Sequence, residues 1–323
     1  MADELDLLRR ANPVPSDDGR FHDRPLDQHA ERRLSRLLHS GRPRRLRRWV
    51  LSVGTAVAVG VTALTLLLSG SATTPAVAAP RPLLIESGST PVPLGRIAAR
   101  AAADRSQRLR QGTHTQTWSL SMTAGPGAGR AVTVPEERVV RWQPDGSSTE
   151  LVVATDPRRP GRPVITGADP VPRTVEDGHV LSRRTFPPSW SDAPPQATPP
   201  RDTGRLRAYL DELDPTGPLG TSQLLDAVGE LLDNWTLGSR ENAAVVRLLA
   251  DAKGLRPAGA VTDRLGRPGQ AYVYEDTAHA VRRMLILNPV TGAVLGLEDT
   301  VTKDDAEFGV RAGDVMSYSA WMR

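Results

Sequence analysis

Three histidines, His114, His179 and His279, are the candidate acid–base residues in the C-terminal two thirds of the chain. A histidine transfers protons in catalysis when a nucleophile or a carboxylate lies within hydrogen-bond reach. None of the three falls in a predicted helix where a carboxylate shares its face. The sequence also contains no nucleophile elbow, zinc-protease motif, phosphate loop or dinucleotide fingerprint. We therefore predict no catalytic residue and expect a protein that is not an enzyme.

Metal and cofactor sites are not predicted either. The chain has no cysteine, which removes disulfides, thiolate ligands and thiol chemistry. His22, His29 and His39 lie in the N-terminal tail without the fixed spacing of a ligand set. The acidic run at 304–307 lacks the glycine and the ligand spacing of a calcium loop, which is typical of a solvated loop. We expect no metal and no cofactor.

An apolar ligand face is the binding site that the sequence suggests. From 113 to 122, large residues alternate with hydroxyl-bearing ones, which predicts a β-strand with two unlike faces. Trp118 and Leu120 fall on the face with the larger residues, and Trp142 belongs to the next predicted strand. We predict that Trp118, Leu120 and Trp142 together form this face.

The elements expected to carry this face form an α+β domain with an antiparallel sheet. A helix is expected after Pro93, followed by a three-stranded meander with a tight turn at 145–146. The prolines of residues 155–202 predict an extended loop, because proline is excluded from helix interiors and central strands. Residues 203–254 predict a helical insertion of three amphipathic segments, and alternating segments predict further strands after it.

Residues 49–68 predict a single transmembrane helix. No charged residue lies between Trp49 and Pro80. At about 1.5 Å per residue, a helix over 49–68 covers roughly 30 Å, one hydrocarbon thickness. Arginines crowd its N-terminal side, so the positive-inside rule places the N-terminus in the cytoplasm and the C-terminal domain outside the cell membrane. The residues expected at the membrane interface are Arg44, Arg45, Arg47, Arg48 and Trp49.

A cleaved signal peptide is the alternative to this anchor. Ala76, Val77 and Ala78 have the small-x-small pattern that signal peptidases cut, which would release a chain beginning at Ala79. Against cleavage, residues 1–48 are a long stretch to precede the apolar run, and the run exceeds the usual length of about 7–15 residues. We expect the segment to remain as an anchor.

The predicted organisation has four parts: a cytoplasmic tail (1–48), the membrane helix (49–68), a linker (69–92) and an extracytoplasmic domain (93–323). In the tail, apolar residues between 26 and 38 recur on one face of a predicted helix that also carries arginines. Such a helix suits the inner leaflet of the lipid bilayer or a cytoplasmic protein. The sequence pI of about 9.9 reflects arginine-rich composition overall, and we expect no nucleic-acid partner.

Four stretches carry a resemblance to a known family: "DELDLLRRANPVP", "LLDAVGELLDNW", "LILNPVTGAVLGLEDTV" and "GDVMSYSAWM". With the basic-flanked single span, they resemble a family of actinobacterial single-pass membrane proteins of unassigned biochemistry. The genes of that family often neighbour extracytoplasmic-function sigma factors. The outer domain is also similar to the lipoprotein-carrier type of half-barrel, an antiparallel sheet curved around helices. That fold occurs in periplasmic regulators of anti-sigma factors and in lipid chaperones, so the resemblance implies a half-barrel-like sheet.

Two functions remain open at this point. In the first, the outer domain senses a ligand or an envelope state, and residues 1–48 contact a cytoplasmic sigma factor or another regulatory protein. In the second, the outer domain is a carrier that binds a lipid or a cell-wall fragment, and the tail only sets the topology. The patterned helix in the tail favours the first, because a passive anchor does not need one.

Overall fold

The computed structural model describes residues 80–121, 131–167, 172–188, 195–213 and 219–322. The predicted tail, the membrane helix at 49–68 and the interface residues Arg44, Arg45, Arg47, Arg48 and Trp49 lie outside the described residues, so they stay predictions. Among the helices in the described ranges, none has both the length and the apolar composition needed to cross a membrane.

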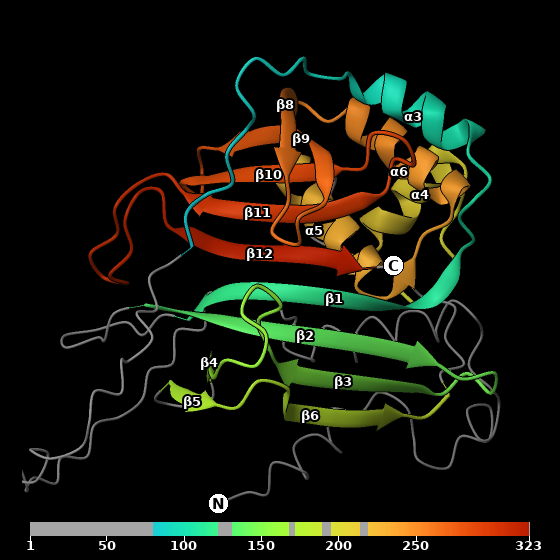
Figure 1. Cartoon of the computed structure of the whole chain (residues 1–323). Helices are drawn as coiled ribbons and strands as arrows, with labels where there is room; N and C mark the ends of the chain where they lie inside the picture. The colour runs from blue at the N-terminus through green and yellow to red at the C-terminus, as the bar shows by residue number, and fades with distance from the viewer. Residues whose placement is uncertain (1–79, 122–130, 168–171, 189–194, 214–218, 323) are drawn as a thin grey trace, which may run out of the picture. The chain divides into compact units, whose positions relative to one another are not determined.

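An antiparallel sheet of ten strands organises the part of the chain that the structure describes (Figure 1). In spatial order its strands are β6 (His179–Phe186), β3 (Ser148–Ala154), β2 (Val132–Trp142), β1 (Arg110–Ser121), β12 (Val315–Met322), β11 (Val294–Val301), β10 (Val281–Leu287), β9 (Pro268–Asp276) and β8 (Arg256–Thr262). The short β7 (Trp235–Thr236) pairs with β1 beside this path. Strands β1 and β12, far apart in sequence, pair in the middle of the sheet. The predicted α+β class with an antiparallel sheet is confirmed, and the half-barrel curvature stays a prediction.

The predicted meander of β1, β2 and β3 is also confirmed. Its second turn places Gly146 at φ +82°, a conformation that glycine adopts without strain. Asp145 supports the turn, because its Oδ1 accepts hydrogen bonds from the backbone N–H and the hydroxyl of Ser147 at 2.8 and 2.7 Å.

The register gives the sheet two faces of different chemistry. Thr115 of β1 lies opposite Trp321 of β12, and Trp321 belongs to the core that the helices share, so we call this side the helix face. Trp118 lies opposite Tyr318 on the other side, which we call the strap face. The alternation expected from 113 to 122 is therefore real, with the hydroxyl-bearing residues of β1 on the helix face.

Four helices in the described ranges cover part of the helix face: α3 (Leu94–Ala103), α4 (Thr203–Asp211), α5 (Thr221–Leu232) and α6 (Ser239–Ala250). They gather beside and behind the C-terminal half of the sheet (Figure 1). The apolar stripe of α5 is buried against sheet residues such as Leu285 and Leu297. Three of the helices fall within 203–254, where the sequence predicts a helical insertion.

Residues 81–92, which we call the strap, bind to the sheet instead of hanging free. Leu83 N–H donates to Glu298 Oε1 of β11 at 2.9 Å, and Glu86 N–H donates to the Ala260 carbonyl of β8 at 2.9 Å. Farther along, Tyr272 Oη donates to the Val92 carbonyl at 2.6 Å. In Figure 1 the strap leads from α3 down across β10 and β11. The predicted linker at 69–92 therefore includes residues that belong to the fold.

Residues 155–202, predicted as a proline-rich loop, contain three strands. The short β4 (Val164–Thr166) and β5 (Arg173–Val175) form a hairpin, and β6 forms one edge of the large sheet. The prediction missed β6 because the prolines on both sides of it dominated the composition. Between 179 and 186 there is no proline, and an edge strand tolerates the flanking prolines that a central strand would not.

Candidate functional site

Trp118, the first residue of the predicted ligand face, lies within a stack of side chains on the strap face. Its side chain is 1% exposed, and its ring centroid lies 5.6 Å from that of Tyr318 at an interplanar angle of 53°. The Arg158 guanidinium lies 4.8 Å from the Trp118 ring centroid, and that of Arg264 lies 5.2 Å from the Tyr318 ring centroid. These four residues, which we call the aromatic ladder, alternate cation–π and aromatic contacts.

A carboxylate holds each end of the aromatic ladder. Asp156 pairs with Arg158 at 2.9 Å and accepts a hydrogen bond from Trp118 Nε1 at 3.2 Å. At the other end, Glu298 pairs with Arg264, and both side chains are almost fully buried. Burial raises the pKa of Glu298, and the Arg264 charge offsets part of that rise. Since Glu298 also binds the strap, this end joins the N-terminal segment to the sheet.

The structure brings together two of the three residues of the predicted ligand face. Trp118 and Leu120 share the strap face, where Leu120 packs near Val301 and Val310. Trp142 lies on the opposite side of the sheet, because Trp118 pairs with Pro135 and Trp142 follows Pro135 by an odd number of positions along β2. Trp118, Leu120 and Trp142 thus do not form one face, and ligand binding by any of them stays a prediction.

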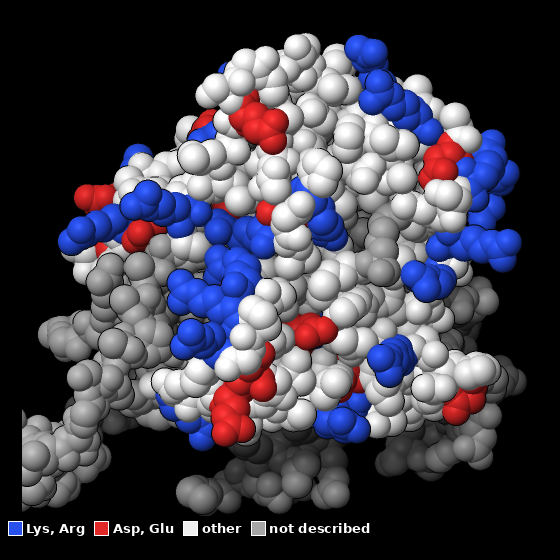
Figure 2. All heavy atoms as spheres, viewed as in Figure 1, with Lys and Arg blue, Asp and Glu red and all other residues white. Residues whose placement is uncertain are grey.

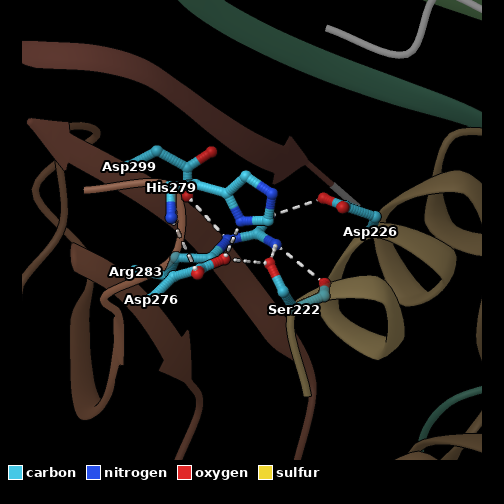
Figure 3. A network of polar contacts seen from close by, with 6 residues as sticks. All are labelled: Ser222, Asp226, Asp276, His279, Arg283 and Asp299. Carbon is cyan, nitrogen blue, oxygen red and sulfur yellow. Dashed lines mark hydrogen bonds and ion pairs between the residues drawn. The ribbon is translucent and has the colours of Figure 1, made fainter. Parts of the chain in front are cut away.

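Arg283 is the centre of a buried polar network on the helix face (Figure 3). Its guanidinium donates to Asp299 Oδ1 at 3.1 Å on the neighbouring strand, to the Ser222 carbonyl at 2.8 Å and to Asp226 Oδ1 at 2.6 Å on α5. Asp299 also accepts from Ser317 Oγ at 2.9 Å on β12. The network therefore joins helix α5 to three adjacent strands through charge-assisted hydrogen bonds.

Ser222, Asp276 and His279 extend this network toward solvent, where they include the residue types of a catalytic triad (Figure 3). Ser222 Oγ donates to Asp276 Oδ2 at 2.7 Å, and His279 Nδ1 contacts the same oxygen at 2.9 Å. In a triad the histidine stands between the nucleophile and the carboxylate, so that it can take the serine proton. Here the Asp276 carboxylate stands between the other two residues, so His279 is not the group that accepts the Ser222 proton. The arrangement therefore differs from a catalytic triad and links α5 to β9.

This network predicts a specific pH dependence of stability. Burial raises the pKa of Asp276, but the hydrogen bonds from Ser222 and His279 and the nearby His279 charge outweigh it and hold the pKa below its ordinary value. A depressed native pKa contributes stability above the unfolded pKa, and that stability is lost as pH falls through the native value. We expect Asp276→Asn to flatten the decline of the unfolding free energy below about pH 4, as followed by urea unfolding. Glu275→Gln on the same strand is the matched control, and equal slopes for Asp276→Asn and wild type would refute the prediction.

The other histidines also have partners or surroundings that the structure defines. His114 Nε2 contacts Glu137 Oε1 across β1 and β2 on the strap face. His179 lines a cavity described below. In the acidic run, Asp305 Oδ1 accepts the N–H of Glu307 at 3.0 Å, and Asp304 accepts that of Ala312 at 2.8 Å, so these carboxylates support the loop. Across the described ranges, no group of three or more histidines or carboxylates could hold a metal ion.

An open cavity of about 420 Å³ lies between β2 and the start of β6, where β3 has ended at Ala154. Its apolar lining comes mainly from Val134, Val180 and Leu181, and its charged or titratable lining from Glu136, Arg173 and His179. Hydroxyl groups of β1 and β4 complete it. A mixed lining with a few convergent polar groups is typical of a binding site for a small group or a side chain.

Two short sequence patterns indicate Arg283 and Asp299 as buried charged residues. "AVRRMLIL" and "VLGLED" place charges next to each other inside apolar strands, and of two adjacent residues in a strand one must face each side. Both sides of this sheet are covered there, so a buried cation and a buried anion on neighbouring strands were to be expected as a pair. Arg283 and Asp299 are that pair.

Comparison with known proteins gives no matching family model and no matching curated protein. Among solved structures, the chain is similar to a chain in the complex of Pseudomonas aeruginosa MucA/MucB, at 15% identity and a TM-score of 0.26 over 71% of this chain and 55% of that chain. It is also similar to the crystal structure of MucB, at 15% identity and a TM-score of 0.25 over 70% of this chain and 55% of that one. The chain spans about half the length of the solved structures that it matches.

Proposed function

We propose that this chain is a regulatory single-pass membrane protein without catalytic activity. In this proposal residues 1–48 lie in the cytoplasm, 49–68 cross the membrane, and the domain from residue 80 onward lies outside and binds a ligand or a partner. The family resemblance of the sequence favours a sigma factor or another regulatory protein as the cytoplasmic partner. A lipid or cell-wall fragment as the outer ligand belongs to the alternative proposal of a carrier.

The observation that carries the proposal is the attachment of the strap. A tether that only holds a carrier near the membrane needs no contacts with the carrier's sheet. Here Leu83 N–H binds the buried Glu298, and Val92 N–H contacts Gln270 Oε1 at 3.3 Å. The strap follows the predicted span and 69–80, so a change in the sheet that alters these bonds reaches the segment that leads to the membrane. That connection supports signalling over simple anchorage.

The proposal is tested with a full-length protein that carries one tag at each end. Protease treatment of right-side-out cells is expected to remove the C-terminal tag and to leave the N-terminal tag on a membrane-bound fragment. Recovery through residues 1–48 is expected to co-purify a sigma factor or another cytoplasmic regulator. A soluble mature chain that begins near Ala79, or a tail without any partner, contradicts the proposal.

Two proline substitutions test the strap within the same experiment. Leu83→Pro removes the N–H that donates to Glu298 and is expected to speed hydrogen exchange along 83–92 and to change the recovery of the tail partner. Leu84→Pro is the matched control, because Leu84 is 83% exposed. Equal partner recovery from Leu83→Pro and wild type, despite a loosened strap, contradicts the proposed connection.

A further inference from the structure

The two edges of the large sheet differ in whether another segment covers them. The strap covers the outer edge of β8: Ile85 bridges Val261, Glu86 N–H binds the Ala260 carbonyl, and Ala260 N–H donates to Ser89 Oγ at 2.9 Å. At the opposite edge, the backbone of β6 pairs with β3 and with no other strand of the described ranges. An edge strand whose outer backbone groups have no strand beside them can pair with another chain.

Strand β6 has the length and the exposure that such pairing needs. It runs for eight residues from His179 to Phe186, and five of them are exposed. Val180 is one of the few large apolar side chains with high exposure in the described ranges, at 48%. An added strand along 179–185 would pair with the outer backbone of β6 and cover this side chain.

The cavity at the start of β6 gives the edge a specificity element. His179, Val180 and Leu181 belong both to β6 and to the cavity lining, so a strand added along β6 would pass beside the cavity. Main-chain pairing supplies affinity in this mode of recognition, and a pocket for one side chain supplies selectivity. With Glu136, Arg173 and His179 in its lining, the cavity offers charged partners of both signs to a polar side chain.

The charge of the β6 side chains indicates which kind of chain could pair with this edge. Arg183 and Arg184 are exposed on β6, which carries no acidic residue. Antiparallel pairing of two copies of β6 would bring these arginines close to each other, and like charges on facing strands are destabilising. An extended segment that carries aspartate or glutamate would instead meet opposite charges. Figure 2 shows that arginine and lysine side chains also gather across the strap face of the molecule.

We propose that β6 is a docking edge for an extended, acidic segment of another protein, which adds a strand to the sheet and brings its carboxylates beside Arg183 and Arg184. The proposal does not depend on the membrane topology or on the strap. If no peptide binds at β6, the proposed regulatory role is unaffected. If the topology test fails, the proposal for β6 is unaffected.

The test uses the purified full chain in nanodiscs and a fluorescent ten-residue peptide of alternating valine and threonine with two aspartates. We expect saturable binding by fluorescence anisotropy and slower hydrogen exchange along 179–186, with no change along 256–262. The same peptide with alternate amides N-methylated cannot form the ladder and is expected to bind at least about tenfold more weakly. Equal binding of the methylated peptide, or protection that excludes β6, overturns the proposal.

Charge variants test the choice of occupant. The double variant Arg183→Glu/Arg184→Glu is expected to weaken binding by about tenfold or more. Arg256→Glu on β8 is the matched control and is expected to leave binding unchanged. Equal affinity for a peptide with asparagine in place of aspartate, dimerisation that the peptide displaces, or binding to protein-free nanodiscs would each overturn the assignment of an acidic protein segment.

Discussion

Replacement of Arg283 with alanine is expected to lower the free energy of unfolding by about 3–5 kcal/mol, because it leaves a buried carboxylate without its cation. Asp299 is 5% exposed and also accepts a hydrogen bond from Ser317 Oγ at 2.9 Å. Burial lowers the pKa of Arg283, but Asp299 and Asp226 more than offset this, so the pKa lies above its ordinary value and the charge persists. Urea unfolding followed by tryptophan fluorescence measures the loss.

The neighbouring exposed arginine supplies the control for this experiment. Arg256→Ala on β8 of the same sheet is expected to change the unfolding free energy by less than about 0.5 kcal/mol. The double variant Arg283→Ala/Asp299→Ala is expected to lose less than the sum of the two single variants, since the second substitution removes the charge that the first left unpaired. Additive losses would show that Arg283 and Asp299 do not depend on each other.

Replacement of Trp118 with alanine is expected to destabilise the fold by about 3–5 kcal/mol, the range for truncating a large buried aromatic side chain. The substitution removes the ring contact with Tyr318, the cation–π contact with Arg158 and the hydrogen bond to Asp156. Thermal unfolding by circular dichroism measures the effect. Trp118 lies in the interior of the strap face, and its predicted contact with a ligand stays a prediction.

Trp142→Ala is the matched comparison, because the sequence assigned Trp118 and Trp142 to the same ligand face. Trp142 is only partly buried, so its truncation is expected to cost about 1 kcal/mol, near the centre of the range for single substitutions. If Trp118→Ala lowers the unfolding free energy only slightly and also weakens binding of a lipid extract by the full-length protein, Trp118 is a ligand contact.

The local pattern of the chain predicted most of the elements of the described domain. Alternation over 113–122 predicted β1, the Asp145–Gly146 pair predicted the hairpin after β2, and the stripe of α5 predicted a buried helix. These signals are local, since side-chain period and turn conformation depend on residues close in sequence. The same reasoning missed β6, because the prolines on both sides of it dominated the composition and its exposed residues carry no apolar alternation.

The site could not be predicted in the same way, because its groups come from distant segments. Leu83 and Glu298 are 215 residues apart, and Trp118 reaches Asp156 across 38 residues. A one-residue change in the register of β2 would have put Trp142 on the strap face beside Trp118. Neither the composition nor the short-range residue spacing predicts the register of β2 against β1.

The sequence by itself determined the uncharged segment at 49–68, the lack of cysteine chemistry and the α+β class, because each depends on composition or on a short period. The tertiary structure alone decided that the strap is part of the sheet, that Arg283 joins α5 to three strands, and that one edge is covered while β6 is exposed. Each of these depends on which strands become neighbours, and strand order is set by the packing of the whole domain.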